Sequence, residues 1–300
     1  MLAILFTQQN RMKTVQILMT SQNYYLKKIF RSHFILIPLT LCFLFIKPLH
    51  ALERVSYMVL AETVEPIMIV KDGDPMAGGI MTEIVKLIFQ HSDYQIEPVV
   101  LPWQRMQEEF KISNDWVTHG IPNSFNKDIP FEMSKLPIFP FNHSAVTLKK
   151  HDISINTLED LRNQDLILVE NFHYAKLDEF IQSEQQKDKS SSIGVLRAFT
   201  PAGTLGMLKH ERGDVVIDWQ VRILYNLPGA GLDIDDIDFH DASKIVPTKN
   251  VHLAFSSHQS EKFRTFVNLR IKQLTDSGQL QDIVEEYYKP VTPPINWPSR

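Results

Sequence analysis

Short apolar segments alternate with segments of helical periodicity along the chain, and this alternation limits the fold more than any other sequence feature. Gly78 and Gly79 precede a run whose apolar residues recur at helical spacing, so we expect a helix to start just past the glycines. The expected elements are a strand over 54–60, a helix over 80–91, a strand over 94–101, a helix over 103–110 and a strand over 116–121. This order predicts an α/β layer with a largely parallel sheet.

The second half of the chain repeats the alternation with elements of its own. Its expected strands cover residues 165–169, 214–217 and 251–255, and its expected helices cover 157–162, 174–183, 204–210, 219–225, 261–275 and 280–288. Polar and acidic composition predicts loops at 185–192 and 233–238. A proline-rich tail over 291–300 is expected to carry no fold.

The first 51 residues have the pattern of an export signal. They contain six basic residues and no acidic residue, with an apolar run over 34–46 that is shorter than the ~20 residues of a membrane-spanning helix. We therefore expect residues 1–51 to be a signal peptide, cleaved after Ala51, and the mature protein to be periplasmic. A retained signal anchor is the alternative. Cys42, the only cysteine, lies in the run, so the mature chain would have no disulfide and no cysteine nucleophile.

The composition of the mature chain disfavours several classes of function. Residues 52–300 carry 25 basic and 35 acidic side chains, and such a negative surface repels nucleic-acid phosphates. The sequence contains no GxSxG, HExxH, Walker or Rossmann glycine pattern, and its histidines show no ligand spacing. We therefore expect no cofactor, no metal site and no nucleic-acid partner.

Seven segments together carry a resemblance to a known family. They are EPIMIVKDGDPMAGGIMTEIVKLIF (65–89), LPWQRM (101–106), PNSFNKDIPFEMSKLPIF (122–139), INTLEDLRNQDLILVE (155–170), ERGDVVID (211–218), LAFSSH (253–258) and LTDSGQLQDIVEEYY (274–288). In their order and spacing they resemble the family 3 extracellular solute-binding proteins, the polar-amino-acid-binding group of periplasmic binding proteins. The resemblance spans residues 54–290.

The resemblance implies a two-lobed α/β protein, a type II venus flytrap, in which each lobe is a mostly parallel sheet flanked by helices. Lobe 1 would comprise residues 52–149 and 250–290, and lobe 2 residues 150–249, with hinge crossings near 148–152 and 246–250. Such a protein closes around a small polar solute because contacts from both lobes exist only when it is shut. It would act as a monomer that serves an inner-membrane ABC permease or a sensor.

The resemblance also assigns candidate ligand-binding residues. Lys127 takes the position of an arginine that clamps the ligand carboxylate, although lysine lacks the guanidinium fork. Trp219 takes the position of a carboxylate that holds the ligand ammonium, with Asp218 one residue earlier. A solvated loop lysine and an ordinary core tryptophan are the alternative interpretations.

Further candidates come from the turn after the 165–169 strand and from lobe 1. The turn from Glu170 to Tyr174 replaces a Gly-Thr or Gly-Ser pair, and its acidic and aromatic character suits a cationic, aromatic or sugar-like ligand. Asn171 and Phe172 are its candidate residues, and Asn171 is alternatively a helix N-cap. Trp103 and Arg105 are expected to line the lobe-1 wall, with Glu65 as a weaker candidate. A structural tryptophan with a surface arginine is the alternative there.

Two other classes of function stay open at this point. A few relatives implied by the resemblance are periplasmic dehydratases, in which Glu170 or Asp218 would act as a cleft acid or base. The other alternative is an orphan structural or signalling domain with a degraded pocket. We expect a non-enzymatic binding protein.

Overall fold

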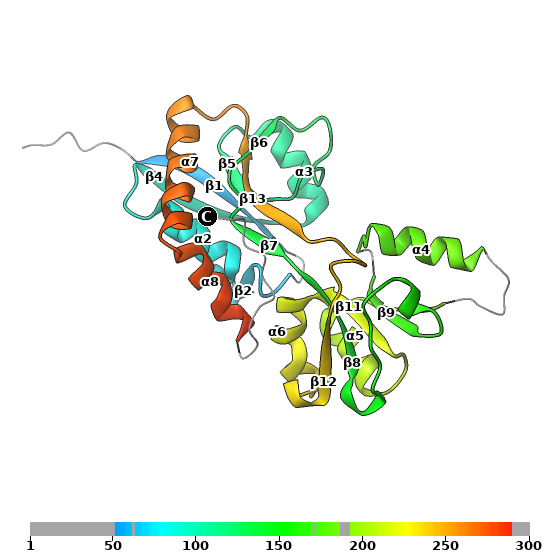
Figure 1. The fold of residues 1–300 in the computed structure, drawn as a ribbon. Helices are drawn as coiled ribbons and strands as arrows, with labels where there is room; N and C mark the ends of the chain where they lie inside the picture. Colours follow the sequence, from blue (N-terminus) through cyan, green and yellow to red (C-terminus); the bar gives the residue numbers. More distant parts are fainter. Residues whose placement is uncertain (1–51, 62–63, 171, 187–192, 290–300) are drawn as a thin grey trace, which may run out of the picture. The chain divides into compact units, whose positions relative to one another are not determined.

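The computed structural model describes residues 52–61, 64–170, 172–186 and 193–289, which form two mixed β-sheets flanked by helices (Figure 1). The expected signal peptide, Asn171 and the proline-rich tail lie outside the described residues. A short hairpin of β2 (Ile69–Lys71) and β3 (Asp74–Gly78) makes a third, two-stranded sheet. Within the described ranges, no helix is long and apolar enough to cross a membrane.

The first sheet is built around the three strands expected from the N-terminal alternation. Its order is β4 (Tyr94–Leu101), β1 (Glu53–Leu60), β5 (Trp116–Gly120), β13 (Lys249–Ser256) and β6 (Phe131–Met133), with β7 (Phe139–Phe141) also paired to β13. Strands β4, β1 and β5 are parallel, and β13 joins β5 antiparallel. A strand from the far end of the chain therefore completes the sheet.

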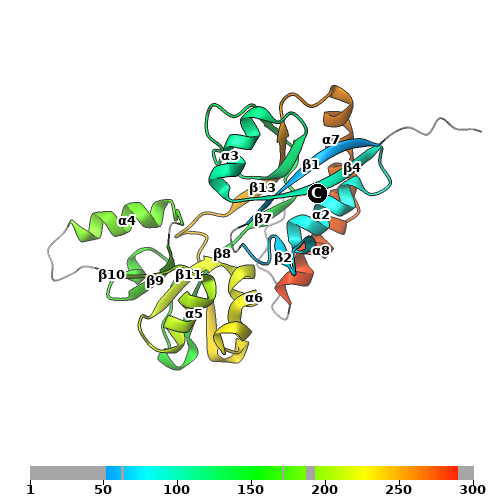
Figure 2. The ribbon, with the colours of Figure 1, turned by 180° about the vertical axis from the view of Figure 1, so that it is seen from behind.

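Helices cover both faces of this first sheet. They are α2 (Ile80–Phe89), α3 (Trp103–Ile112), α7 (Glu261–Asp276) and α8 (Gln279–Tyr288). Helices α2, α7 and α8 pack together, and α3 packs against β1. The chain moves one way across the sheet through α2 and back through α3, so right-handed crossovers place these two helices on opposite faces (Figures 1 and 2).

The second sheet repeats this plan. Its order is β10 (Gly194–Ala198), β9 (Asp165–Val169), β11 (Val215–Trp219), β8 (His143–Leu148) and β12 (Ile237–Asp241). The helices of this part are α4 (Lys176–Gln185), α5 (Pro201–Lys209) and α6 (Gln220–Ala230), with short 3-10 turns η1 (Lys149–His151), η2 (Glu159–Leu161) and η4 (Ile234–Asp236). Strands β10, β9 and β11 are parallel, β8 pairs antiparallel with β11, and β12 pairs antiparallel with β8.

The chain passes between the two sheets twice. It leaves the first sheet after Phe141 and enters the second at His143, and it returns between Asp241 and Lys249. The first passage lies earlier than the expected crossing near 148–152. The reason is that β8, whose six residues are all buried, pairs with β11 and β12 and so belongs to the second sheet.

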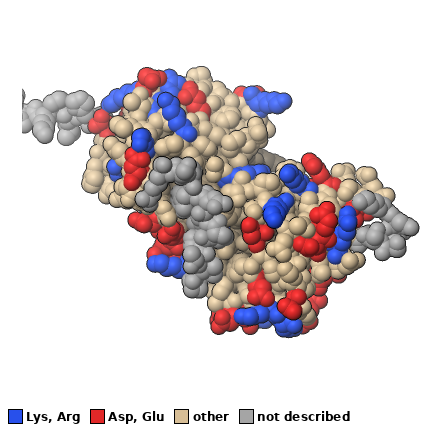
Figure 3. All heavy atoms as spheres, viewed as in Figure 1, with Lys and Arg blue, Asp and Glu red and all other residues tan. Residues whose placement is uncertain are grey.

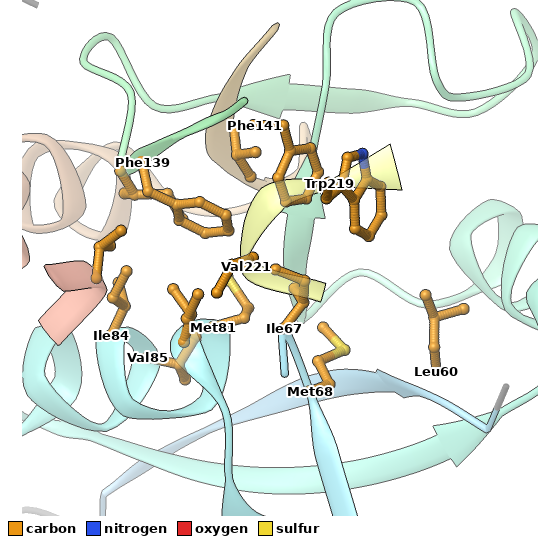
Figure 4. Packing of buried hydrophobic residues seen from close by; sticks show 14 of the residues in the cluster. Leu60, Ile67, Met68, Met81, Ile84, Val85, Phe139, Phe141, Trp219 and Val221 are labelled. Atoms are coloured by element: carbon orange, nitrogen blue, oxygen red, sulfur yellow. The ribbon is translucent and has the colours of Figure 1, made fainter. Parts of the chain in front are cut away.

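A continuous apolar core accompanies these passages. One cluster of buried side chains includes Ile67 and Met81 from the first-sheet part, Phe141 from β7, Trp219 from the end of β11 and Val221 from the start of α6. Figure 4 shows Val221 lying close to Met81 and Ile67. The start of α6 is therefore anchored in the apolar surface beside α2, and further along the chain α6 also contacts α8. On the face shown in Figure 3, acidic and basic side chains are interspersed.

Candidate functional site

The parallel strands of each sheet end together, and the segments that follow them carry the candidate residues. In the first sheet Leu60 pairs with Leu101, so β1 and β4 end at one edge, and the register of β5 brings Gly120 to the same edge. In the second sheet Val169 pairs with Ala198, and β11 runs alongside β9. Ligands of open α/β sheets bind outside the carboxyl ends of such strands. These two edges are therefore the place to look for a site.

Trp219, at the end of β11, is enclosed by side chains on both faces of its indole. The Phe141 ring stacks on it with centroids 4.2 Å apart, and the Phe172 ring meets it edge-on at 5.2 Å. The guanidinium carbon of Arg222 lies 4.2 Å from the indole centroid and 4.9 Å from that of Phe172. Trp219 is only 8% exposed. In this conformation the indole is part of the core and offers no open face for stacking.

Asp218 is engaged with Arg222, four residues later in the first turn of α6. Both side chains are buried, and the guanidinium Nε donates to Oδ1 and Oδ2 of Asp218 at 2.9 and 2.8 Å. Nη2 of Arg222 also donates to Oδ1, and the Trp219 backbone N–H donates to the same oxygen at 2.7 Å. The carboxylate charge is thus balanced inside the protein, because a buried carboxylate without such a partner would be very costly.

His143, the first residue of β8, is buried beside this ion pair. It is paired in register with Trp219, and its ring lies 6.5 Å from Phe172. Neither ring nitrogen has a hydrogen-bond partner among the described residues. Burial, and then the positive charges of Arg222 and Lys249, lower the pKa of His143 to about 3. The imidazole is therefore neutral at physiological pH.

A hollow of about 590 Å³ lies on the first-sheet side, at the N-terminal end of α3. Trp103, Arg105, Gln107 and Asn126 are among its lining residues. The Asn126 backbone N–H donates to Gln107 Oε1 at 3.3 Å, which leaves Gln107 Nε2 buried with no partner in the described part of the chain. Trp103 packs against Phe110 and Phe125 of the core.

The remaining candidates of the first-sheet edge differ in their surroundings. Arg105 and Lys127 are exposed, and within the described ranges neither has a carboxylate in ion-pair distance. Glu65 is half-buried, and its Oε2 atom has no hydrogen-bond partner among those residues. It lies near Tyr225 of α6, whose pKa is raised by burial and by the Glu65 charge. Asn171 lies outside the described residues.

Comparison of the whole fold with solved structures gives strong matches. One is a histidine kinase sensor domain with similarity to periplasmic binding proteins, at 17% identity and a TM-score of 0.56, covering 81% of this chain and 99% of that chain. Another is the probable amino-acid ABC transporter extracellular-binding protein ytmK from Bacillus subtilis, at 13% identity and a TM-score of 0.62, covering 80% and 99%. The chain has the two-lobed periplasmic-binding-protein fold.

A third match with this fold is an ABC uptake transporter substrate-binding protein from Streptococcus pneumoniae with bound histidine. It has 14% identity and a TM-score of 0.56, and it covers 78% of this chain and 92% of that chain. No family model matches the chain, and no curated protein matches it significantly. The periplasmic-binding-protein fold places the first sheet in lobe 1 and the second sheet in lobe 2.

Within the periplasmic-binding-protein fold, the sequence candidates fall into two groups. Trp103, Arg105 and Lys127 follow strands of lobe 1. In lobe 2, Phe172 follows β9 and Trp219 is the last residue of β11. The structure brings Trp103 and Arg105 to one hollow and Phe172 and Trp219 to one aromatic cluster.

Sequence reasoning missed Arg222, Phe141, His143 and Gln107. For Arg222 a signal existed, because an aspartate at a strand end and an arginine four residues later can pair on the first helical turn. Phe141 and His143 lie on strands that the sequence pattern did not define. Gln107 lies on the expected helix over 103–110, but its unpartnered amide depends on packing against Asn126, which the sequence does not show.

Proposed function

We propose that this protein binds a small polar solute between its two lobes, for ABC-type uptake or for sensing, after export to the periplasm. The observation that carries the proposal is the fold, in which the carboxyl ends of both parallel strand sets bear the candidate residues. Among the similar structures are a histidine kinase sensor domain and transporter binding proteins. Solute binding is the activity for which such an arrangement suffices without any catalytic group.

The proposed solute contacts come from both lobes. Lobe 1 supplies Trp103, Arg105, Lys127 and Glu65, and lobe 2 supplies the wall formed by Phe172 and its neighbours. Lys127 is an exposed point charge with no carboxylate partner among the described residues, which supports a role toward the solute.

Catalysis by a cleft carboxylate has less support. Asp218 is enclosed and held by three donors of its own chain, so it has no free oxygen directed at a substrate in this conformation. The described residues contain no cluster of three metal-ligating side chains. Neither alternative function has an observation of this kind in its favour.

Thermal unfolding of the mature chain with a panel of amino acids, amines, carboxylates and sugars tests the proposal. A ligand of the native state at 100 times its Kd stabilises the protein by about 2.7 kcal/mol. Lys127→Ala should weaken this stabilisation, whereas Lys71→Ala, at an exposed position on β2, should leave it unchanged. If no compound of a broad panel raises the unfolding temperature, the binding function is contradicted.

A further inference from the structure

We infer that the hollow beside α3 is a subsite for a carboxylate group of the solute, so that the solute is an organic anion with an apolar part. The inference deepens the proposed function and rests on it. It concerns Trp103, Arg105 and Gln107, which line the hollow together with Ser124 and Asn126.

The hollow presents hydrogen-bond donors. Arg105 supplies a guanidinium group, and Gln107 supplies an amide whose orientation is set because its Oε1 already accepts the Asn126 N–H. Gln107 is only 6% exposed, and its buried Nε2 donor has no partner among the described residues. A buried donor without an acceptor is costly, so an incoming acceptor in the hollow would relieve that cost.

The start of α3 adds to the same preference. The residue before the helix is Pro102, no side chain caps the helix, and its first turn contains no acidic residue. The first backbone N–H groups of a helix have no intrahelical partner and carry partial positive charge, which favours an anion. The buried donor of Gln107 is independent of this helix terminus.

Two acidic side chains lie near the hollow, and Glu108 also lines it, but together with Lys111, Arg105 and Lys127 these five groups carry a net charge of +1. Lys111 lies 2.9 Å from Glu108 Oε1 and 3.0 Å from Asp128 Oδ2, so one lysine holds both carboxylates. Arg105 and Lys127 remain without an ion-pair partner in the part of the chain that the structure describes. The local excess charge is therefore positive, as a carboxylate subsite requires.

The aromatic corner of lobe 2, formed by Trp219 and Phe172, does not offer the complementary site that a cationic solute would need. Asp218 is paired with Arg222, and that guanidinium already covers the Trp219 and Phe172 rings. An internal cation thus fills the aromatic corner where a solute cation would be attracted. Two acidic candidates are left, Glu65 at the lobe-1 edge and Glu170 directly after β9, and a cationic probe tests their influence directly.

Three probes with the same ring separate charge from shape: phenylacetate, phenylacetamide and phenethylamine. Isothermal titration of the mature chain should give phenylacetate a Kd at least tenfold lower than that of phenylacetamide, a difference of about 1.4 kcal/mol. Phenethylamine should bind more weakly than the amide. Equal affinity for the acid and the amide, preference for the amine, or binding of none of the three would overturn the inference.

Matched variants locate the effect. Arg105→Gln should raise the phenylacetate Kd at least tenfold and leave the phenylacetamide Kd within twofold, and Arg105→Lys should recover part of the loss. Gln107→Met, which keeps the length of the side chain and removes the donor, should raise the phenylacetate Kd about threefold or more. Arg212→Gln, an exposed arginine of lobe 2, is the control and should change nothing. Phenylacetate binding that survives both hollow variants places the carboxylate elsewhere.

Failure of this inference can be told from failure of the proposed function. If the three probes fail while another compound of the broad panel stabilises the protein, solute binding stands and the carboxylate subsite falls. If no compound binds, both fall.

Discussion

Replacing Arg222 by methionine should destabilise the protein by about 4 kcal/mol, because it leaves the Asp218 carboxylate buried without its ion-pair partner. Asp218 is 1% exposed and Arg222 3% exposed, so water cannot take over the solvation of either charge. Removing one partner of a buried ion pair costs about 3–5 kcal/mol. Loss of the guanidinium over Trp219 and Phe172 adds to this cost, whereas the methionine side chain keeps much of the packing against the rings.

Urea denaturation followed by tryptophan fluorescence measures this loss as a shift of the midpoint at constant slope. For a chain of this size, about 4 kcal/mol corresponds to a fall in the melting temperature of roughly 8–16 °C. Arg212→Met, at an exposed position, is the matched control and should change stability by less than about 0.5 kcal/mol.

A double-mutant cycle isolates the pair. Asp218→Asn combined with Arg222→Met removes both charges and keeps an oxygen at position 218 for the Trp219 N–H. The double variant should be more stable than Arg222→Met alone, with a coupling free energy of at least about 2 kcal/mol. A loss below about 1 kcal/mol for the single variant, or a coupling near zero, would refute the buried-pair reasoning.

Three further predictions concern stability. Burial lowers the pKa of His143 to about 3, so below about pH 6.5 the unfolded state binds a proton that the folded state does not. The free energy of unfolding should therefore fall by about 1.4 kcal/mol for each unit by which the pH is lowered. His143→Gln should remove this contribution in urea denaturation measured from pH 7 to pH 5, and an unchanged pH dependence would contradict the prediction. Tyr287→Phe should lower the free energy of unfolding by about 1–3 kcal/mol in the same assay, because the Tyr287 hydroxyl donates to Glu83 and accepts the Gly79 N–H at 2.9 Å. An unchanged stability would mean that water replaces both hydrogen bonds. Gly79→Ala should lower the free energy of unfolding by about 3 kcal/mol, measured by thermal unfolding, because φ of residue 79 is 103° and the added Cβ would lie 2.7 Å from the Ile67 carbonyl oxygen. An unchanged stability would show that the backbone around residue 79 rearranges to relieve the contact.

Several parallel strands of both sheets could be predicted from the sequence. Strands β4 and β9 have the expected limits, and α2 begins directly after Gly79 as expected. These elements have long apolar runs or clear helical spacing, so the local pattern alone defines them.

Elements defined by tertiary pairing were missed. Strand β8 begins with His143 and Ser144, and β12 has the sequence IDFHD, so neither has the apolar pattern by which a strand is predicted. Both are strands because β8 pairs with β11 and β12 pairs with β8. The expected helix over 157–162 is only the 3-10 turn η2, since the segment is too short to form several helical turns. The error in β8 also displaced the expected hinge crossing.

The candidate site was predictable as a set of positions but not as a set of contacts. Sequence order located Trp103, Arg105 and Trp219 after strand ends, where α/β sheets bind ligands. It could not show that Arg222 occupies the aromatic corner, or that Gln107 keeps a buried donor free of partners. Such facts depend on side-chain packing between segments far apart in the chain.

Closure of the two lobes around a solute is tested most directly by a distance measured between them. The only cysteine of the chain is Cys42, so in a protein that begins at Leu52 spin labels would be unique at Pro122→Cys in lobe 1 and Phe199→Cys in lobe 2, both exposed positions beyond strand ends. With a saturating ligand from the panel, the distance distribution should shift to shorter values and narrow. An unchanged distribution in the presence of calorimetrically proven binding would contradict the two-lobed closing mechanism.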